Sequence, residues 1–145
     1  MKLHMGCGLI KKTEFVNIDI DPKCKPDYVL DVSKPLPFPD DSVEYILADN
    51  LWEHIGDDFI PMMIEWHRVS KKGAVWHIRV PHVDSHAAFQ DPTHKRFFCE
   101  ETFDYFNKKH DRWKHYGKGY GIPPFNILKF KKEERFIDCK MEVVK

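Results

Sequence analysis

The spacing of short apolar segments, and the residues at which they end, constrain the fold of this chain more than any other feature. Five apolar and β-branched runs predict strands that are separated by turns and connections. They cover residues 2–5, 15–20, 27–32, 43–48 and 74–80. Large apolar residues recur at helical spacing over residues 57–70, which predicts a helix with one buried face. Strands that alternate with such connections are typical of a mainly parallel α/β sheet.

The C-terminal part of the chain predicts a different local arrangement. A short helix is expected at residues 100–106, and two further strands at 125–130 and 135–143 are joined by a charged turn. We expect those two strands to form an antiparallel hairpin at one end of a sheet of about seven strands. The chain has 145 residues, which fits a single domain over 1–145. Residues 83–125 interrupt the strand rhythm and predict a loop or lid region on the substrate side.

Composition and charge weigh against several classes of partner. The 23 basic and 23 acidic residues cancel, so no overall field would attract nucleic acid or an anionic membrane. No apolar run approaches the ~20 residues that a membrane span needs. The four cysteines form no Cys-x-x-Cys pair, which favours free thiols and a cytoplasmic location. We expect a small-molecule substrate, no nucleic-acid partner and no membrane partner, and the oligomeric state stays open.

Polar residues follow the predicted strands at the ends that should meet at one edge of the sheet. A Gly-Cys-Gly turn follows the first strand, Asp19 ends the second, Asp31 ends the third, and Asn50 comes after the fourth. In open α/β sheets, ligands bind beyond the carboxyl ends of the strands, near the switch point of the strand order. The sequence therefore predicts a ligand site at this edge.

The first crossover discriminates between two ribose-containing cofactors. Only six residues separate Gly8 from Phe15, fewer than the dozen or so that a parallel crossover usually needs. The first helix should be reduced to about one turn or be absent. NAD needs a helix N-terminus under its pyrophosphate, whereas S-adenosylmethionine carries no phosphate. Asp19 can accept both hydroxyls of the ribose in either cofactor. The missing helix is therefore the feature that favours S-adenosylmethionine over NAD.

The segments LHMGCG, VNIDIDP, DYVLDVSKPLPFPDDSVEYILADNLWEHI, EWHRVSKKGAVWHIRVP and DPTHKRFF occur in that order over residues 3–106. Together they resemble the class I S-adenosylmethionine-dependent methyltransferases. The resemblance implies a Rossmann-like fold, S-adenosylmethionine as cofactor, and methyl transfer to a small-molecule acceptor such as a saccharide or related metabolite. The shortened first crossover departs from the family pattern, which normally places a helix there.

The resemblance also implies roles for individual residues. The glycine turn would face the methionine portion of the cofactor, Asp19 would hold the ribose hydroxyls, and Asp31 would lie at the adenine. The implied cofactor-binding residues are Gly6, Cys7, Gly8, Asp19, Asp31, Val32, Asn50 and Leu51.

Histidines follow the strands at which an acceptor would meet the methyl group. Holding the acceptor close and aligned supplies much of the rate of a methyl transfer. A base is needed when the acceptor is a hydroxyl or a protonated amine, and histidine suits that role near neutral pH. His86 and His94 follow the fifth predicted strand and His54 follows the fourth, so we expect these three as catalytic candidates. The glycine-rich residues 107–125 would form the lid.

Two alternatives stay open at the level of sequence. His82, His86 and His94, with neighbouring aspartates, would supply ligands for a metal-dependent hydrolase or oxygenase. Their spacing matches no established metal motif, and the main prediction contains no metal site. The other alternative is a non-catalytic module that binds S-adenosylmethionine without turning it over.

Overall fold

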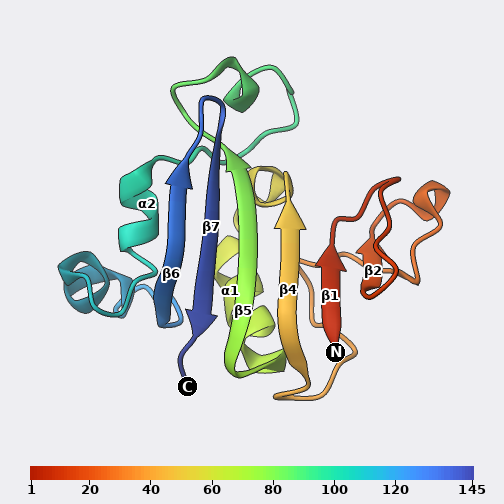
Figure 1. Ribbon diagram of the computed structural model, residues 1–145, viewed down its shortest axis with the longest axis horizontal. Helices are drawn as coiled ribbons and strands as arrows, with labels where there is room; N and C mark the ends of the chain where they lie inside the picture. Colours follow the sequence, from red (N-terminus) through yellow and green to blue (C-terminus); the bar gives the residue numbers. More distant parts are fainter.

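The computed structural model describes residues 1–145, which form one seven-stranded sheet (Figure 1). The strands are β1 (Lys2–Met5), β2 (Val16–Asp19), β3 (Tyr28–Val29), β4 (Val43–Asp49), β5 (Ser70–Pro81), β6 (Phe125–Lys132) and β7 (Phe136–Val143). Their order in the sheet is β3-β2-β1-β4-β5-β7-β6. The first five strands are parallel, whereas β7 is antiparallel to both of its neighbours. The α/β class and the C-terminal hairpin are confirmed.

The helices are few and short. The two α-helices are α1 (Phe59–Val69) and α2 (Glu100–Asp104). Three 3₁₀ turns and one π-helix complete the set: η1 (Pro22–Cys24), η2 (Trp52–His54), η3 (His86–Ala88) and the π-helix η4 (Trp113–Gly117). None of these helices has the combination of length and hydrophobicity that crossing a bilayer requires.

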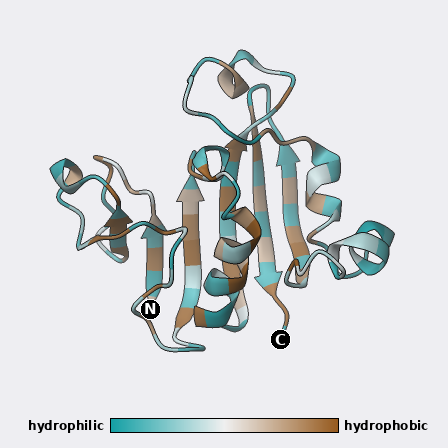
Figure 2. Cartoon of the chain, turned by 180° about the vertical axis from the view of Figure 1, so that it is seen from behind, coloured by the Kyte–Doolittle hydropathy of each residue, from teal (hydrophilic) through white to brown (hydrophobic).

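Only one face of the sheet is covered by a helix. The connections from β1 to β2, from β2 to β3 and from β3 to β4 contain no α-helix. The predicted shortening of the first crossover is therefore confirmed. As a result, α1 packs against one face while the strands of the opposite face lie open (Figures 1 and 2).

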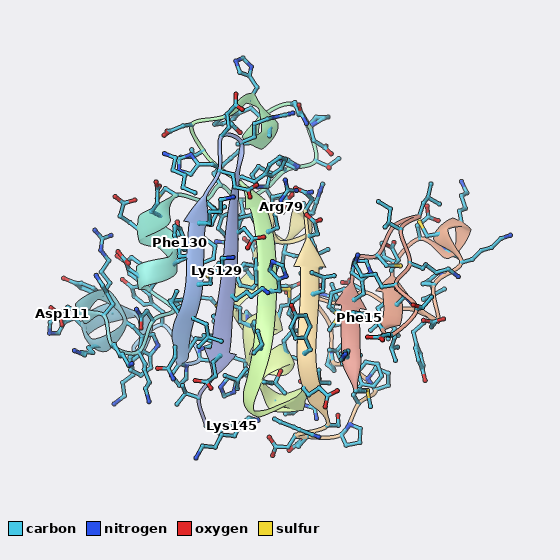
Figure 3. All side chains as sticks on the ribbon, viewed as in Figure 1. Phe15, Arg79, Asp111, Lys129, Phe130 and Lys145 are labelled. Carbon is cyan, nitrogen blue, oxygen red and sulfur yellow. The ribbon has the colours of Figure 1, made fainter.

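The open face is polar enough to meet water. Side chains alternate across a strand, so Trp76 and Cys139 are fully buried towards α1 while His77, Arg79 and Asp138 project from the other side. His77 Nε2 lies 2.8 Å from Asp138 Oδ2, and Arg79 packs over an aromatic ring of β7. Figure 3 shows Arg79 on this side of the sheet. Polar and charged side chains thus occupy the face where a second helical layer would pack.

Buried tryptophans form the centre of the core between α1 and the sheet. Trp52, Trp66 and Trp76 are each 0% exposed. The ring centroids of Trp66 and Trp76 are 5.6 Å apart, and Phe59 packs on Trp52 at 5.1 Å. Large aromatic rings of this kind dominate the burial energy of a small domain. The indole N–H of Trp66 also donates to the carbonyl oxygen of Val32 at 2.9 Å, which ties the chain after β3 to the helix.

Two predicted strand boundaries were wrong. Strand β5 begins directly after α1, at Ser70, instead of at the expected residue 74, so Lys71, Lys72 and Gly73 belong to the strand. Gly73 has a φ of +79° and lies where the pairing of β4 with β5 shifts register, so this glycine serves a β-bulge. Strand β3 has only two residues, both exposed at the sheet edge, instead of the six expected at 27–32.

Arg68, in the last turn of α1, holds the connection between β3 and β4. Its guanidinium pairs with the carboxylates of Glu65 and Asp40 and donates to the carbonyl oxygens of Leu36 and Phe38 at 3.3 and 3.1 Å. Glu65 Oε1 in turn accepts the Leu36 N–H at 2.7 Å. Prolines within this connection have no N–H to donate, so the connection does not form a regular helix or strand. Arg68 and Glu65 instead supply hydrogen-bond partners for its backbone groups.

We predict that Arg68→Ala lowers the free energy of unfolding by about 1–3 kcal/mol, because it leaves two part-buried carbonyls without this donor and removes the cation paired with Glu65. Urea denaturation followed by tryptophan fluorescence measures the change. Lys71→Ala, at an exposed position of β5, is the matched control and should change stability by less than about 0.5 kcal/mol. Equal effects of the two substitutions would contradict the assignment.

Candidate functional site

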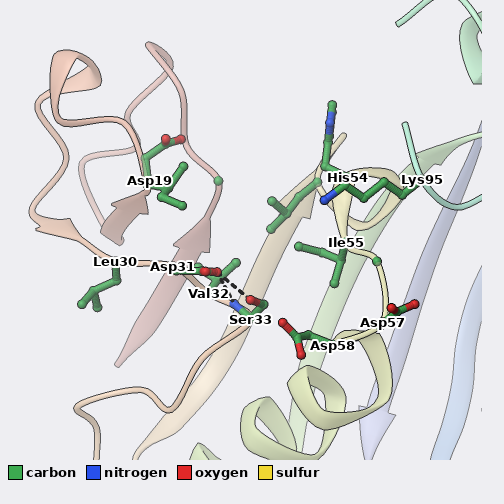
Figure 4. Close-up of a pocket in the computed structure, with 14 residues that line it drawn as sticks. Asp19, Leu30, Asp31, Val32, Ser33, His54, Ile55, Asp57, Asp58 and Lys95 are labelled. Carbon is green, nitrogen blue, oxygen red and sulfur yellow. Dashed lines mark hydrogen bonds between the residues drawn. The ribbon is translucent and has the colours of Figure 1, made fainter. Parts of the chain in front are cut away.

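A cavity of about 600 Å³ lies at the carboxyl edge of the parallel strands, within the ~300–1,000 Å³ range of small-molecule sites. Its walls come from three parts of the chain (Figure 4): the residues that follow β1, β2 and β3, the segment from η2 to the start of α1, and Lys95. The strand order reverses between β1 and β4, so the cavity occupies the predicted switch point.

The glycine turn and Asp19 form one wall of this cavity. Gly6 has a φ of +65°, which side chains rarely adopt, and a Cβ there would lie 2.8 Å from Leu51 Cδ1, so a larger residue would be strained and would displace Leu51. Asp19 Oδ2 accepts the Gly8 N–H at 2.8 Å and Oδ1 accepts the Asp21 N–H at 2.9 Å. The carboxylate therefore holds the turn against the end of β2 while it lines the cavity.

The cavity is rich in carboxylates. Asp19, Asp31, Asp57 and Asp58 line it, together with two basic residues, Lys95 and His54. Burial opposes ionisation of Asp31, but hydrogen bonds from the Ser33 hydroxyl at 2.7 Å and backbone N–H at 2.9 Å lower the pKa of this carboxyl. Asp58 is also paired with Lys34 at 2.6 Å. The excess of carboxylates over basic side chains at the cavity favours a ligand that carries positive charge and disfavours a pyrophosphate.

The cofactor-binding residues predicted from the sequence fall into two groups. Gly6, Asp19, Asp31, Val32 and Leu51 line the cavity. The remaining three do not line it: Cys7, Gly8 and Asn50. Cys7 is buried in the core, and a left-handed backbone (φ +52°) carries Asn50 towards a second, smaller hollow.

That second hollow, of about 200 Å³, lies beside the cavity and shares His54 with it. Glu53, Asp91 and His94 line it as well. The rings of His54 and His94 meet edge to face with centroids 4.8 Å apart. The structure thus brings two of the three predicted catalytic histidines together next to the cofactor-sized cavity.

Glu53 is the most unusual residue of this hollow. Its side chain is 2% exposed, and neither carboxylate oxygen has a hydrogen-bond partner. Burial raises the pKa of Glu53 to about 7. Glu53 is not among the site residues predicted from the sequence, although it directly precedes His54, which is.

The other two histidines of the predicted cluster lie apart. His86 is exposed at the first residue of η3 and lines neither hollow. His82 is buried, accepts the Asp84 N–H at Nδ1 (3.0 Å), and therefore donates from Nε2 to Glu100 Oε2 (2.7 Å). With both ring nitrogens engaged, His82 cannot join His86 and His94 in a metal site. The alternative based on that trio was wrong.

Residues 107–125 do not cover the cavity. They follow α2 and lie beside β6, at the opposite edge of the sheet from β2 and β3, and none of them lines the two hollows (Figure 1). A Cβ on Gly117 would lie 2.6 Å from the Tyr105 carbonyl oxygen, and the Trp113 indole donates to the Ile122 carbonyl at 3.0 Å. Here glycine permits close packing, and the predicted lid at this edge was wrong.

The fold matches solved structures at low sequence identity, while the sequence matches no protein-family model and no curated protein. A methyltransferase dependent on S-adenosylmethionine from Archaeoglobus fulgidus aligns with a TM-score of 0.68 at 15% identity, over 97% of this chain and 85% of that one.

A 1,6-didemethyltoxoflavin-N1-methyltransferase from Burkholderia thailandensis, with S-adenosylhomocysteine bound, aligns at 0.67 and 12% identity over 99% and 71%. The [4+2]-cyclase SpnF aligns at 0.68 and 11% identity over 99% and 75%. The chain therefore has the Rossmann-like fold of class I methyltransferases, and the reaction must be argued from its own site.

The pairing of His82 with Glu100 generates a prediction about acid stability. The hydrogen bond from His82 lowers the pKa of Glu100 to about 2, from an ordinary value of 4.5. A carboxyl whose pKa is depressed in the folded state stabilises the fold above its ordinary pKa and loses that contribution as the pH falls. The unfolding free energy should therefore drop between about pH 5 and pH 3, and the drop should be smaller in Glu100→Gln.

The control variant is Glu44→Gln, which removes an exposed carboxylate without an ion pair and should keep the wild-type pH dependence. Urea titrations at about pH 5 and pH 3 measure the unfolding free energy of each protein. An equal drop in unfolding free energy between the two pH values in Glu100→Gln and in wild type would contradict the prediction.

Proposed function

We propose that this chain is a methyltransferase that transfers the methyl group of S-adenosylmethionine to a small-molecule acceptor. The observation that carries the proposal is the carboxylate-lined cavity at the switch point, with Asp19 on its wall, in a fold shared with methyltransferases. The sulfonium compound supplies an electrophilic methyl group and a good leaving group. The residues of the chain bind it, orient it and hold the acceptor in line.

Different lining residues of the cavity suit the ribose, the adenine and the methionine portion of the cofactor. Asp19 would accept the ribose hydroxyls, as acids at the end of the second strand do in nucleotide-binding sheets. Leu30 and Val32 offer an apolar surface next to Asp31, which suits the adenine ring. Gly6 and Leu51 would contact the methionine portion, and Lys95 provides a partner for its carboxylate.

Charge supports this cofactor over a dinucleotide. The sulfonium and the ammonium of S-adenosylmethionine are both positive, and four aspartates line the cavity. The β1–β2 connection contains no α-helix, so the helix N-terminus that binds a pyrophosphate is missing. A dinucleotide phosphate would meet carboxylates without that compensation.

The hollow beside the cavity is the proposed acceptor site. His54 lines both spaces, so an acceptor in the hollow would lie next to the methyl group. Its volume of about 200 Å³ suits a small acceptor group, and its side chains are mainly polar. A saccharide or a related polyhydroxylated metabolite fits that lining.

We predict that S-adenosylmethionine and S-adenosylhomocysteine bind the chain in calorimetric titration, and that Asp19→Asn raises both dissociation constants about 5- to 150-fold. Asparagine can still accept the Gly8 N–H, but its NH2 group replaces the oxygen that accepts the Asp21 N–H and cannot accept a ribose hydroxyl, a loss of about 1–3 kcal/mol. Asp21→Asn is the matched control, because Asp21 does not line the cavity.

Two results would contradict the proposal. One is the absence of S-adenosylmethionine binding by the wild-type chain, and the other is equal affinity in wild type and Asp19→Asn. Turnover is measured separately as the release of S-adenosylhomocysteine in the presence of mixed hydroxylated metabolites. Binding without any release would favour the non-catalytic binding module over the enzyme.

A further inference from the structure

Glu53, His54 and His94 each bring one potential ligand atom within 4.8 Å of the others. We propose that these three side chains bind a divalent transition-metal cation in the hollow beside the cofactor cavity. Two imidazoles and one carboxylate form a donor set suited to Mn²⁺, Fe²⁺, Co²⁺ or Zn²⁺. This trio differs from the histidine cluster expected from the sequence, with which it shares only His94.

The carboxylate of Glu53 is the observation that points to a ligand. It is 2% exposed, and both of its oxygens are without a hydrogen-bond partner. A buried carboxylate is strongly disfavoured unless it is paired or coordinates a metal. Asp91 lines the same hollow and adds further negative charge. A cation in this hollow would satisfy a group that the protein itself leaves unpartnered.

The hydrogen bonds around the two imidazoles orient them for coordination. His94 Nδ1 lies 2.8 Å from the Ala88 carbonyl oxygen, which can only accept, so Nδ1 carries the proton. Thr93 Oγ1 donates to Asp91 Oδ1 at 2.7 Å and therefore accepts from His54 Nδ1 at 3.0 Å. In both rings Nε2 then keeps a free lone pair. Fixing one nitrogen so that the other can ligate is the usual outer-shell arrangement around a metal.

The spacing of the trio allows closure around an ion. Metal–nitrogen and metal–oxygen bonds of ~2.1 Å place neighbouring ligand atoms ~3–3.5 Å apart. The present separations of up to 4.8 Å require the three side chains to move inwards by ~1 Å, which is within the reach of small rotamer changes. Three protein ligands leave coordination positions for an exogenous oxygen.

The role of the ion rests on the proposed function, whereas its binding does not. An acceptor hydroxyl bound to the cation becomes more acidic. Its O–H bond breaks and the proton leaves to solvent, an oxygen lone pair forms the bond to the methyl carbon, and the C–S bond breaks with its electron pair on sulfur. The proposal therefore names the substrate class: a hydroxyl-bearing acceptor that gives an O-methyl product.

Cobalt(II) binding tests the site without any need for activity. The full chain, produced without a histidine tag and stripped with EDTA, is titrated with Co²⁺ and followed by visible absorption and calorimetry. We expect one Co²⁺ per chain and an affinity at least tenfold weaker in Glu53→Gln and in His94→Ala, because even outer-shell changes weaken metal sites about 10- to 100-fold. His77→Ala, which removes a half-buried histidine on the open sheet face, should bind Co²⁺ as wild type does.

Further measurements separate the possible outcomes. Circular dichroism confirms that each variant is folded, and Glu53→Gln preserves the shape of the buried side chain if His94→Ala does not fold. Acetohydroxamate, a bidentate oxygen ligand, should shift the Co²⁺ bands. Absence of Co²⁺ binding, equal affinity in Glu53→Gln and wild type, or unchanged bands with acetohydroxamate would overturn the proposal. When S-adenosylmethionine binding is measured on the EDTA-stripped protein, its failure would count against the proposed function and leave the metal site standing.

Discussion

The site depends on one backbone interaction between distant parts of the chain. The carbonyl oxygen of Glu53 accepts the N–H groups of Lys95 and Arg96 at 2.7 and 3.1 Å. The guanidinium of Arg96 reinforces this contact by donating to the Gly56 carbonyl at 3.0 Å and by packing over the ring of Phe59. Because of these contacts, the loop after β5 lies against η2, and the cofactor-sized cavity and the smaller hollow become neighbours. Without them, the carboxyl edge of the strands would remain, but nothing would hold the polar residues of the two loops together.

The sheet is likewise built with few helices. Parallel sheets are usually covered on both faces, yet three successive crossovers here contain no α-helix. The chain compensates on the open face with polar pairs, such as the hydrogen bond of His77 with Asp138 and the ion pair of Arg79 with Asp49, while the opposite face concentrates its large aromatic residues. The helix that would support a bound phosphate is among the missing elements. The loss of that helix therefore shapes both the architecture and the class of cofactor that the edge can accept.

The sequence predicts the order and type of the elements because local signals determine them: β-branched runs, the apolar stripe of α1 and the short Gly8-to-Phe15 connection. It fails where tertiary contacts decide. The pairing of β4 with β5 extends β5 back to Ser70, and no local pattern reveals that pairing. The histidines illustrate the same limit, since spacing along the chain groups His82 with His86 and His94, whereas hydrogen bonding commits His82 to Glu100. Glu53 escapes sequence reasoning because its significance lies in its burial, which the fold alone establishes.

The contrast between Glu53 and the other buried polar residues argues that its isolation has a functional cause. His4 pairs with Asn17, Ser70 bonds both Trp66 and Trp76, and Ser85 donates to a backbone carbonyl. This fold is therefore able to provide partners for the polar groups that it buries. Besides the two Glu53 oxygens, only Trp52 Nε1 and Asn126 Oδ1 are buried without a partner, and the Asn126 amide still donates to Glu142 at 2.8 Å. Glu53 is the one ionisable side chain in this set, and it lies beside two oriented imidazoles. Unpartnered groups of that kind are expected at functional sites, where a ligand supplies what the chain omits. The indole N–H of the neighbouring Trp52 is also buried without a partner. Trp52 belongs to η2, the turn that connects the core to the site.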